Sequence, residues 1–306
     1  MKYSILPFFL AVILAACGSD NSSSSNNDND PSTDPESTET SSSSAKGGKK
    51  VPSGSSSSSS VDEDETEQSS SSGVRFAVDW EVPKEACLNP DINYGTMTDP
   101  RDKKVYRTIT IDMGDLERTW MAENLNYYDE SDPSVKDKSW CYGKADNKDS
   151  STCDVIGRYY TWAAAIDSAG IYSKSRDCGY GKECAKPGTV FDGICPPGWY
   201  LPRDLEWEDL FRALEKLQLP MNTALMSRCG WLDDNNGTDD IGFGAMPAGS
   251  GDNKGYAGGS SAHFWSSTEN GMFRASCIDM WEGYLKIDSN TVKDQGFNVR
   301  CIKYVE

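Results

Sequence analysis

The chain has 306 residues and a formal net charge of −18, with 48 acidic residues against 30 Lys and Arg and a single histidine. The negative field of such a chain repels phosphate backbones and excludes a nucleic-acid partner, and one histidine excludes a multi-histidine metal site. Composition also argues for one folded domain, because residues 18–73 hold 22 serines and eleven acids and only the part from Val74 onward can bury a core.

Residues 1–16 have the features of an export signal, with a basic start and an apolar run that ends in small residues. The apolar run is shorter than the ~20 residues that a membrane-spanning helix needs. The sequence LAAC at 14–17 resembles a bacterial lipobox, which implies cleavage before Cys17 and a lipid on Cys17. We therefore expect a lipoprotein held in a membrane through Cys17; a secretory signal beside an unmodified cysteine is the alternative.

Residues 17–73 predict a disordered tether that starts at the lipidated cysteine. Serine runs alternate with acidic patches, and too few apolar residues are present to offset the chain entropy lost on folding. No Asp follows Cys17 directly, which resembles lipoproteins that are sent to the outer membrane. The expected location is the outer membrane, facing the periplasm or the cell surface. The tether lets a folded head reach away from the lipid, or it only crosses a crowded envelope layer.

Beyond a lead-in segment at 74–92, the first expected element is a β-hairpin. KVYRTITI at 104–111 alternates between two faces, and RTWMA at 118–122 can pair with it across the intervening turn. All nine tryptophans and nine of the ten cysteines lie from Val74 onward, in the lead-in segment and the part after it. A head that begins here can therefore bury a sizeable core.

Two helices are expected next, followed by short strands. Apolar residues at i, i+3, i+4 and i+7 predict a helix over 157–167, and a second helix begins after Pro202 with Asp204 as its cap. Gly, Asn and Asp become frequent after Gly230, which is typical of turns between strands. The expected strands are 242–246, 263–266, 273–280, 283–287 and 297–304. This pattern predicts the α+β class.

Several blocks rich in aromatic, Gly and Pro residues occur along the head. They are WMAENLNY at 120–127, GRYYTWAAA at 157–165, CPPGWYLP at 195–202, FWSSTE at 264–269 and GFNVRC at 296–301. In this order they resemble the Fibrobacter succinogenes major paralogous domain, over residues 93–306. The resemblance implies a C-type lectin-like fold, here two helices packed on short antiparallel strands and stapled by disulfides. It also implies an envelope protein, but no activity.

Nine cysteines remain after Cys17, and the oxidising surroundings of an exported chain favour disulfides. Two pairs flank short polar segments and are expected as local staples. A third disulfide is expected between two cysteines that lie in the family's sequence blocks. A fourth joins two of the remaining three cysteines, so that one cysteine stays unpaired. The hypothetical pairs are, in that order, Cys141–Cys153, Cys178–Cys184, Cys195–Cys301 and Cys229–Cys277, with Cys87 free.

The densest group of oxygen ligands is DDNNGTDD at 233–240. Calcium prefers six to eight oxygens, but this spacing lacks the EF-hand pattern and the residue pairs through which sugar-binding C-type lectins hold calcium. A solvated turn is therefore favoured, and no cofactor is expected. If this loop did bind calcium, the candidate ligands would be Asp233, Asn235, Asp239 and Asp240.

A catalytic constellation is not expected. His263 can be combined with Ser266 or Ser267 into a Ser-His-acid triad, but these serines belong to a strand block without a nucleophile elbow. A strand histidine with a satisfied hydrogen bond is the favoured interpretation. The carboxylate pairs Asp204/Glu206 and Asp239/Asp240 fit a helix start and a turn better than a glycosidase pair.

Three aromatic residues near turns are the candidates for binding a ligand, since flat rings stack on sugars. They are Trp231, Tyr256 and Trp281. The predicted function is a noncatalytic recognition or adhesion head, with a glycan or an envelope protein as partner. One alternative is an enzyme like the formylglycine-generating oxidases, which use two close cysteines near the C-terminus, whereas here Cys277 is the nearest one before Cys301. The other is a structural envelope protein without a soluble ligand.

Overall fold

The structure, a computed structural model, describes residues 83–112, 117–142, 151–171, 177–186, 188–251 and 260–305. The predicted signal, Cys17, the tether, residues 74–82 of the lead-in segment and Tyr256 lie outside these residues. No helix in the described part is long and apolar enough to cross a membrane.

Helices are short except for α4. They are η1 (Lys84–Cys87), α1 (Ser151–Ile156), α2 (Trp162–Ala165), α3 (Ser168–Ile171), α4 (Asp204–Lys216) and η2 (Leu232–Asp234). The strands are β1 (Gly95–Thr98), β2 (Val105–Asp112), β3 (Glu117–Met121), β4 (Ser139–Trp140), β5 (Tyr159–Tyr160), β6 (Trp199–Tyr200), β7 (Ala262–Asn270), β8 (Arg274–Trp281), β9 (Tyr284–Val292) and β10 (Ile302–Lys303). The mixture of helix and sheet confirms the predicted α+β class.

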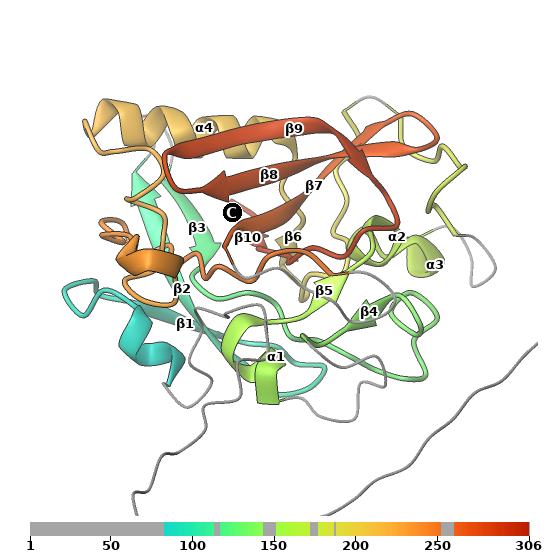
Figure 1. Ribbon diagram of the computed structural model, residues 1–306. Coiled ribbons are helices and arrows are strands. Elements are labelled where there is room, and N and C mark those ends of the chain that lie inside the picture. Colours follow the sequence, from blue (N-terminus) through green and yellow to red (C-terminus); the bar gives the residue numbers. More distant parts are fainter. Residues whose placement is uncertain are drawn as a thin grey trace, which may run out of the picture. The chain divides into compact units, whose positions relative to one another are not determined.

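Within the described ranges, the strands form three antiparallel sheets (Figure 1). The largest has the order β1-β2-β3-β10-β6, so the last strand of the chain lies between β3 and β6. β2 pairs with β3, with Ile109 opposite Trp120, which confirms the predicted hairpin. β7, β8 and β9 form a separate three-stranded meander, and β4 pairs with β5.

The helix α4 confirms the prediction of a helix after Pro202 and runs along the meander (Figure 1). Its apolar face packs with the meander and the β2–β3 hairpin in one core; Trp207, for example, stacks on Phe264. The prediction of Asp204 as the cap is wrong, because the N-cap is Arg203, whose backbone N–H donates to Glu206 at 2.9 Å. Asp204 instead accepts hydrogen bonds from the hydroxyls of two serines of the meander, Ser266 and Ser276.

The helix predicted over 157–167 is wrong in its first half. Tyr159 and Tyr160 instead form β5, which pairs with β4, and the backbone of Tyr160 also exchanges hydrogen bonds with that of Phe297. The helix α2 begins only after Thr161, whose side chain accepts a hydrogen bond from the Ala164 amide. Apolar spacing does not distinguish this buried strand from a helix turn, because both Tyr160 and Trp162 are fully buried.

Two predicted strands are shorter than expected. Segment 242–246 forms only a single bridge, between Met226 and Ala245, because Gly242 and Gly244 have φ angles of 76° and 59° that interrupt an extended chain. Within 297–304, only β10 is a strand. The residues before it, such as Phe297, pair through isolated bridges.

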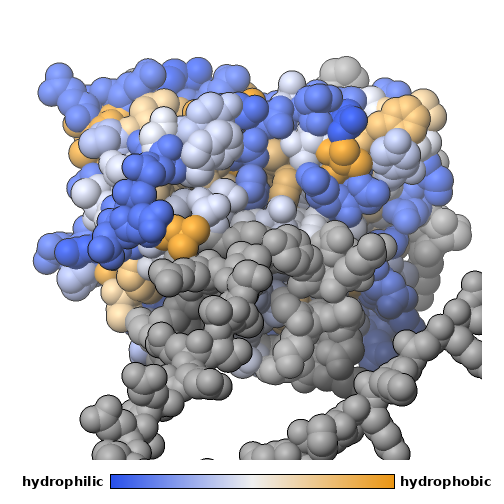
Figure 2. Space-filling model, viewed as in Figure 1, coloured by the Kyte–Doolittle hydropathy of each residue, from blue (hydrophilic) through white to orange (hydrophobic). Residues whose placement is uncertain are grey.

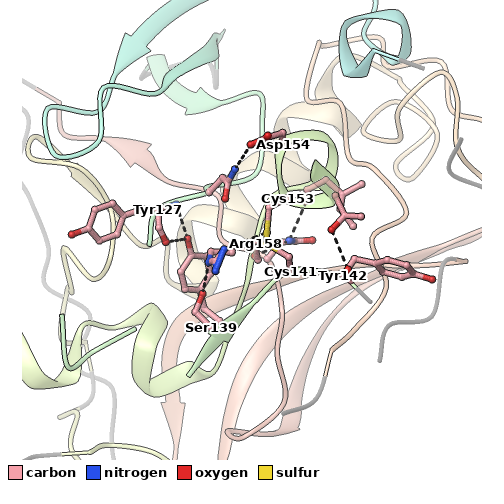
Figure 3. The surroundings of a disulfide bond; sticks show 12 residues. Tyr127, Ser139, Cys141, Tyr142, Cys153, Asp154 and Arg158 are labelled. Atoms are coloured by element: carbon pink, nitrogen blue, oxygen red, sulfur yellow. Dashed lines mark hydrogen bonds between the residues drawn. A yellow bond between two sulfur atoms is a disulfide. The ribbon is translucent and has the colours of Figure 1, made fainter. Parts of the chain in front are cut away.

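Three of the predicted disulfides are confirmed: Cys141–Cys153, Cys178–Cys184 and Cys195–Cys301. Figure 3 shows the first, with Arg158 pointing toward it. The guanidinium of Arg158 donates to Ser139 at 2.9 Å and contacts the sulfur of Cys141 at 3.1 Å. This staple therefore holds β4, α1 and the chain after α1 together.

The predicted pair Cys229–Cys277 is wrong, and so is the free Cys87. Cys87, at the end of η1, pairs with Cys229 across a Cα separation of 4.8 Å. The adjacent Arg228 amide also donates to the Cys87 carbonyl, so η1 is docked on this loop. Cys277 lies in the middle of β8, opposite Trp265, and its thiol is buried and free. Its neighbours are the oxygens of Thr291 and Asp279, at 3.0 and 3.2 Å.

Candidate functional site

The site lies at one end of the β7–β8–β9 meander. Alternate residues of a strand point to opposite faces, and Phe264, Ile278 and their neighbours point into the core beside α4. On the other face His263 pairs with Asp279, and Asp279 pairs with Lys286, in one row across the three strands. The next row at this end holds Ser261 before β7 and the pair Trp281 and Tyr284.

A pocket of about 500 Å³ opens at this end of the meander, and we name it the Trp281 pocket. Three segments supply its walls: the loop around η2, the start of β7 and the turn between β8 and β9. The described residues that line it are Trp231, Leu232, Asp233, Asn235, Ser260, Ser261, His263, Trp281 and Glu282. Two of the three predicted ligand aromatics therefore share one pocket.

The two tryptophans play different parts in this pocket. Trp281 is 37% exposed, and one ring face stacks on Tyr284 with the centroids 3.7 Å apart. Trp231 is only 5% exposed and donates its indole N–H to the Ser227 hydroxyl at 3.1 Å. Trp281 is thus the ring that a flat ligand can reach, whereas Trp231 belongs to the core and forms part of the wall.

Polar side chains complete the rim. The Asn235 amide donates to the Glu282 carboxylate at 2.7 Å and thereby connects the η2 loop with the β8–β9 turn. Asp233, beside it, has a left-handed backbone with φ 54°, a conformation that Asp tolerates better than most residues. A ring flanked by amide and carboxylate groups suits a ligand that has apolar faces and many hydroxyl groups.

The four calcium candidates do not converge. Asp233 and Asn235 line the pocket, whereas Asp240 accepts from the Thr238 hydroxyl at 2.6 Å. Asp239 is fully buried, and its carboxylate accepts from the backbone amides of Asn89 and Gly244. In the part of the chain that the structure describes, no group of three or more His, Cys, Asp and Glu is arranged to hold a metal ion.

The triads that the sequence allows with Ser266 or Ser267, but does not favour, do not form. Both serines are buried, and the Ser266 hydroxyl donates to Asp204 at 2.6 Å. His263 contacts Ser261 instead, with 2.8 Å between Nε2 and Oγ. Its other nitrogen, Nδ1, lies 2.8 Å from Oδ1 of Asp279.

Sequence reasoning missed Ser261 and Asp279. The spacing Ser261-x-His263 places two side chains on one face of a strand, which the sequence does show. The register that brings Asp279 opposite His263 depends on the turn between β7 and β8, and no local signal fixes it. Burial opposes ionisation of Asp279, but hydrogen bonds from His263 and Cys277 and the charge of Lys286 outweigh it, so the pKa of its carboxyl is lowered.

A second cavity, of about 270 Å³, lies between η1, β2 and α1 and reaches the buried Arg300. Arg300 donates to the carbonyls of Met121, Phe243 and Gly244 and to the side chain of Asn124. Burial lowers the pKa of its guanidinium to about 9. Since its donors already have protein acceptors, this arginine connects core segments and offers little to a ligand.

The sequence model described as the Fibrobacter succinogenes major domain matches residues 112–303, which include every described residue of the Trp281 pocket. No curated protein and no solved structure matches the chain. The α+β class and the disulfide staples rest on the structure itself, and the C-type lectin-like fold stays a prediction.

Proposed function

The chain belongs to the Fibrobacter succinogenes major domain family, and on this premise we propose that it is a cell-envelope lipoprotein whose head recognises a glycan in the Trp281 pocket. The observation that carries the proposal is the position of Trp281. It is a large, partly exposed ring in a hollow, with one face supported by Tyr284. Rigid aromatic platforms with a few polar groups beside them are typical of ligand sites.

The charges at the rim indicate the kind of glycan. Asp233 and Glu282 are carboxylates, and the described lining has no Lys or Arg. The chain as a whole carries −18. Because like charges repel, uronic-acid polymers would bind poorly, and a neutral polysaccharide is the favoured ligand.

The surface supports a head exposed to water. The part of the face in Figure 2 that is drawn in colour is largely hydrophilic, and its apolar residues form small, separate patches. We place the lipid on Cys17 and the head at the end of the serine-rich tether, in the outer membrane. The tether then allows the pocket to meet polysaccharide away from the lipid surface.

The oxidase alternative has less support. Cys301 is bonded to Cys195, and Cys277 is a buried thiol on β8. Burial raises the pKa of that thiol far above its usual value, so its reactive thiolate form is suppressed. The two sulfurs therefore do not form a reactive pair.

A polysaccharide array tests the proposal. The mature chain, with Cys17→Ser to keep it soluble, is applied to neutral and uronic-acid-rich polysaccharides, with and without calcium. We expect saturable binding to neutral polymers that does not need calcium and is lost in Trp281→Ala. An array without saturable binding by a well-folded chain would overturn the proposal.

A further inference from the structure

Three side chains of the Trp281 pocket and its floor form a continuous chain of hydrogen bonds. Ser261 Oγ lies 2.8 Å from Nε2 of His263, and Nδ1 of His263 lies 2.8 Å from Oδ1 of Asp279. β7 and β8 lie side by side in Figure 1, and their register sets Asp279 directly opposite His263. The sheet therefore fixes the pair His263 and Asp279, and Ser261 directly precedes the first residue of β7.

The partners determine where the imidazole proton lies. An ionised Asp279 can only accept, so Nδ1 of the neutral ring carries the hydrogen and donates it to Asp279. Nε2 then has a free lone pair and accepts from the Ser261 hydroxyl. This is the tautomer in which a histidine can remove a proton from a serine.

The surroundings hold this geometry in place. The His263 ring stacks on Phe297, with the centroids 4.8 Å apart and the planes 18° from parallel. Asp279 is also contacted by the thiol of Cys277 at 3.2 Å and by the Lys286 ammonium at 3.9 Å. The side chains of His263 and Asp279 are 16% and 13% exposed, so they are shielded without being sealed off.

Access is provided by the pocket, because Ser261 and His263 both line it. A hydroxyl that faces a pocket of about 500 Å³ can meet an acyl group carried by a bound ligand. Neither serine that the sequence suggested for a triad has this position, since Ser266 and Ser267 are buried.

We propose that Ser261, His263 and Asp279 hydrolyse O-acyl esters on the glycan that the pocket binds, with Ser261 as nucleophile and His263 as general base. The glycan part of this inference rests on the proposed function. It changes the sequence-based expectation of a noncatalytic head, because that expectation considered the wrong serines.

The reaction consumes water and one ester. Ser261 Oγ attacks the ester carbonyl carbon while Nε2 of His263 takes the hydroxyl proton. The bond from the carbonyl carbon to the sugar oxygen breaks, and His263 returns the proton to that oxygen, which leaves as an alcohol. Water then attacks the acyl group on Ser261 and gives a proton to His263. The carboxylic acid departs as the proton returns to Ser261. Asp279 acts through His263 as a positioning residue.

Labelling with a fluorophosphonate tests the nucleophile. The mature chain carrying Cys17→Ser is treated with the probe, digested and mapped by mass spectrometry. We expect the label on the peptide that contains Ser261, no label there in Ser261→Ala, and labelling at least about 100-fold slower in His263→Gln. The exposed Ser289→Ala on β9 is the matched control and labels like the parent chain.

Hydrolysis of 4-nitrophenyl acetate tests the positioning residue. Asp279→Asn should lower kcat by ~10³-fold and leave KM unchanged, because the tautomer of His263 is lost while the pocket stays. Unlabelled Ser261, or equal rates in Ser261→Ala and the parent chain, would overturn the inference. Glycan binding without labelling of Ser261 would contradict only the proposed triad. Labelling of Ser261 without glycan binding would contradict only the proposed function.

Discussion

Asp239 has no exposed surface and is held by one donor nearby in the chain and two donors about 150 residues before it. The amides of Asn89 and Gly244 and the Tyr94 hydroxyl all contact its carboxylate. Burial raises the pKa of Asp239 from 3.8 to about 6 in spite of these hydrogen bonds. The residue that the sequence suggested as a calcium ligand is thus a structural carboxyl, which joins the lead-in segment to the head.

This raised pKa predicts an unusual pH dependence of stability. The folded state binds its proton more tightly than the unfolded chain, so the contribution is fully present below the usual pKa and is lost as the pH rises through about 6. Relative to Asp239→Asn, the parent chain should lose ~2–3 kcal/mol of unfolding free energy between pH 4 and pH 7. Urea unfolding at several pH values measures both curves, and parallel curves would contradict the assignment.

At the scale of elements, the sequence predicts those helices and strands that are determined by the pattern of neighbouring residues. α4 and the β2–β3 hairpin were predicted because apolar spacing and alternation are local signals. β5 is not predictable locally because its partners, β4 and Phe297, lie outside its own segment of the chain. The row of His263 and Asp279 was missed for the same reason, since its register is set by the whole meander.

The disulfides follow the same division. Cys141–Cys153 and Cys178–Cys184 close short segments and were predicted from spacing, and Cys195–Cys301 came from the family's blocks. The predicted pair Cys229–Cys277 leaves Cys87 free, and no local signal indicates that Cys87, 142 residues before Cys229, is the true partner. The docking of η1 on the loop before Trp231 shows that the folded head begins before residue 93.

This disulfide connectivity predicts which thiol is free but unreactive in the folded chain. In the Cys17→Ser chain, non-reducing peptide mapping should find Cys87 joined to Cys229. Iodoacetamide should modify Cys277 only after unfolding, because the thiol is buried and its pKa is raised. Replacing both Cys87 and Cys229 by Ser should lower stability by ~4–5 kcal/mol in the chain-entropy model, measured by urea unfolding. A peptide that joins Cys229 to Cys277 would contradict this arrangement.

For the whole molecule, composition alone predicts the division into anchor, tether and head. The serine-rich, acidic segment and the lipobox-like end of the signal are visible without any structure. The pocket is different, because its walls come from three segments that only the fold brings together. The sequence predicts Trp281 as a ligand-binding residue because it lies near a turn. It does not predict all the polar residues that line the pocket beside Trp281.

The anchor predicts where the protein is found in the cell. Replacing Cys17 by Ser should move the chain from the membrane fraction to the soluble fraction and abolish incorporation of radiolabelled palmitate. Ser19→Ala, two residues away, should leave both properties unchanged. Membrane fractionation and fluorography measure these outcomes, and a palmitate-labelled Cys17→Ser chain would contradict lipidation at this residue.

The most direct test of the glycan pocket is a calorimetric titration of the Cys17→Ser chain with the neutral polysaccharide that the array selects. Trp281→Ala should raise Kd at least tenfold, about 1.4 kcal/mol, and Trp281→Phe should raise it less because an aromatic face remains. Tyr180→Ala is the matched control, since Tyr180 is exposed and contacts Phe273, which lies just before the far end of β8. Unchanged affinity in a folded Trp281→Ala chain would contradict the account.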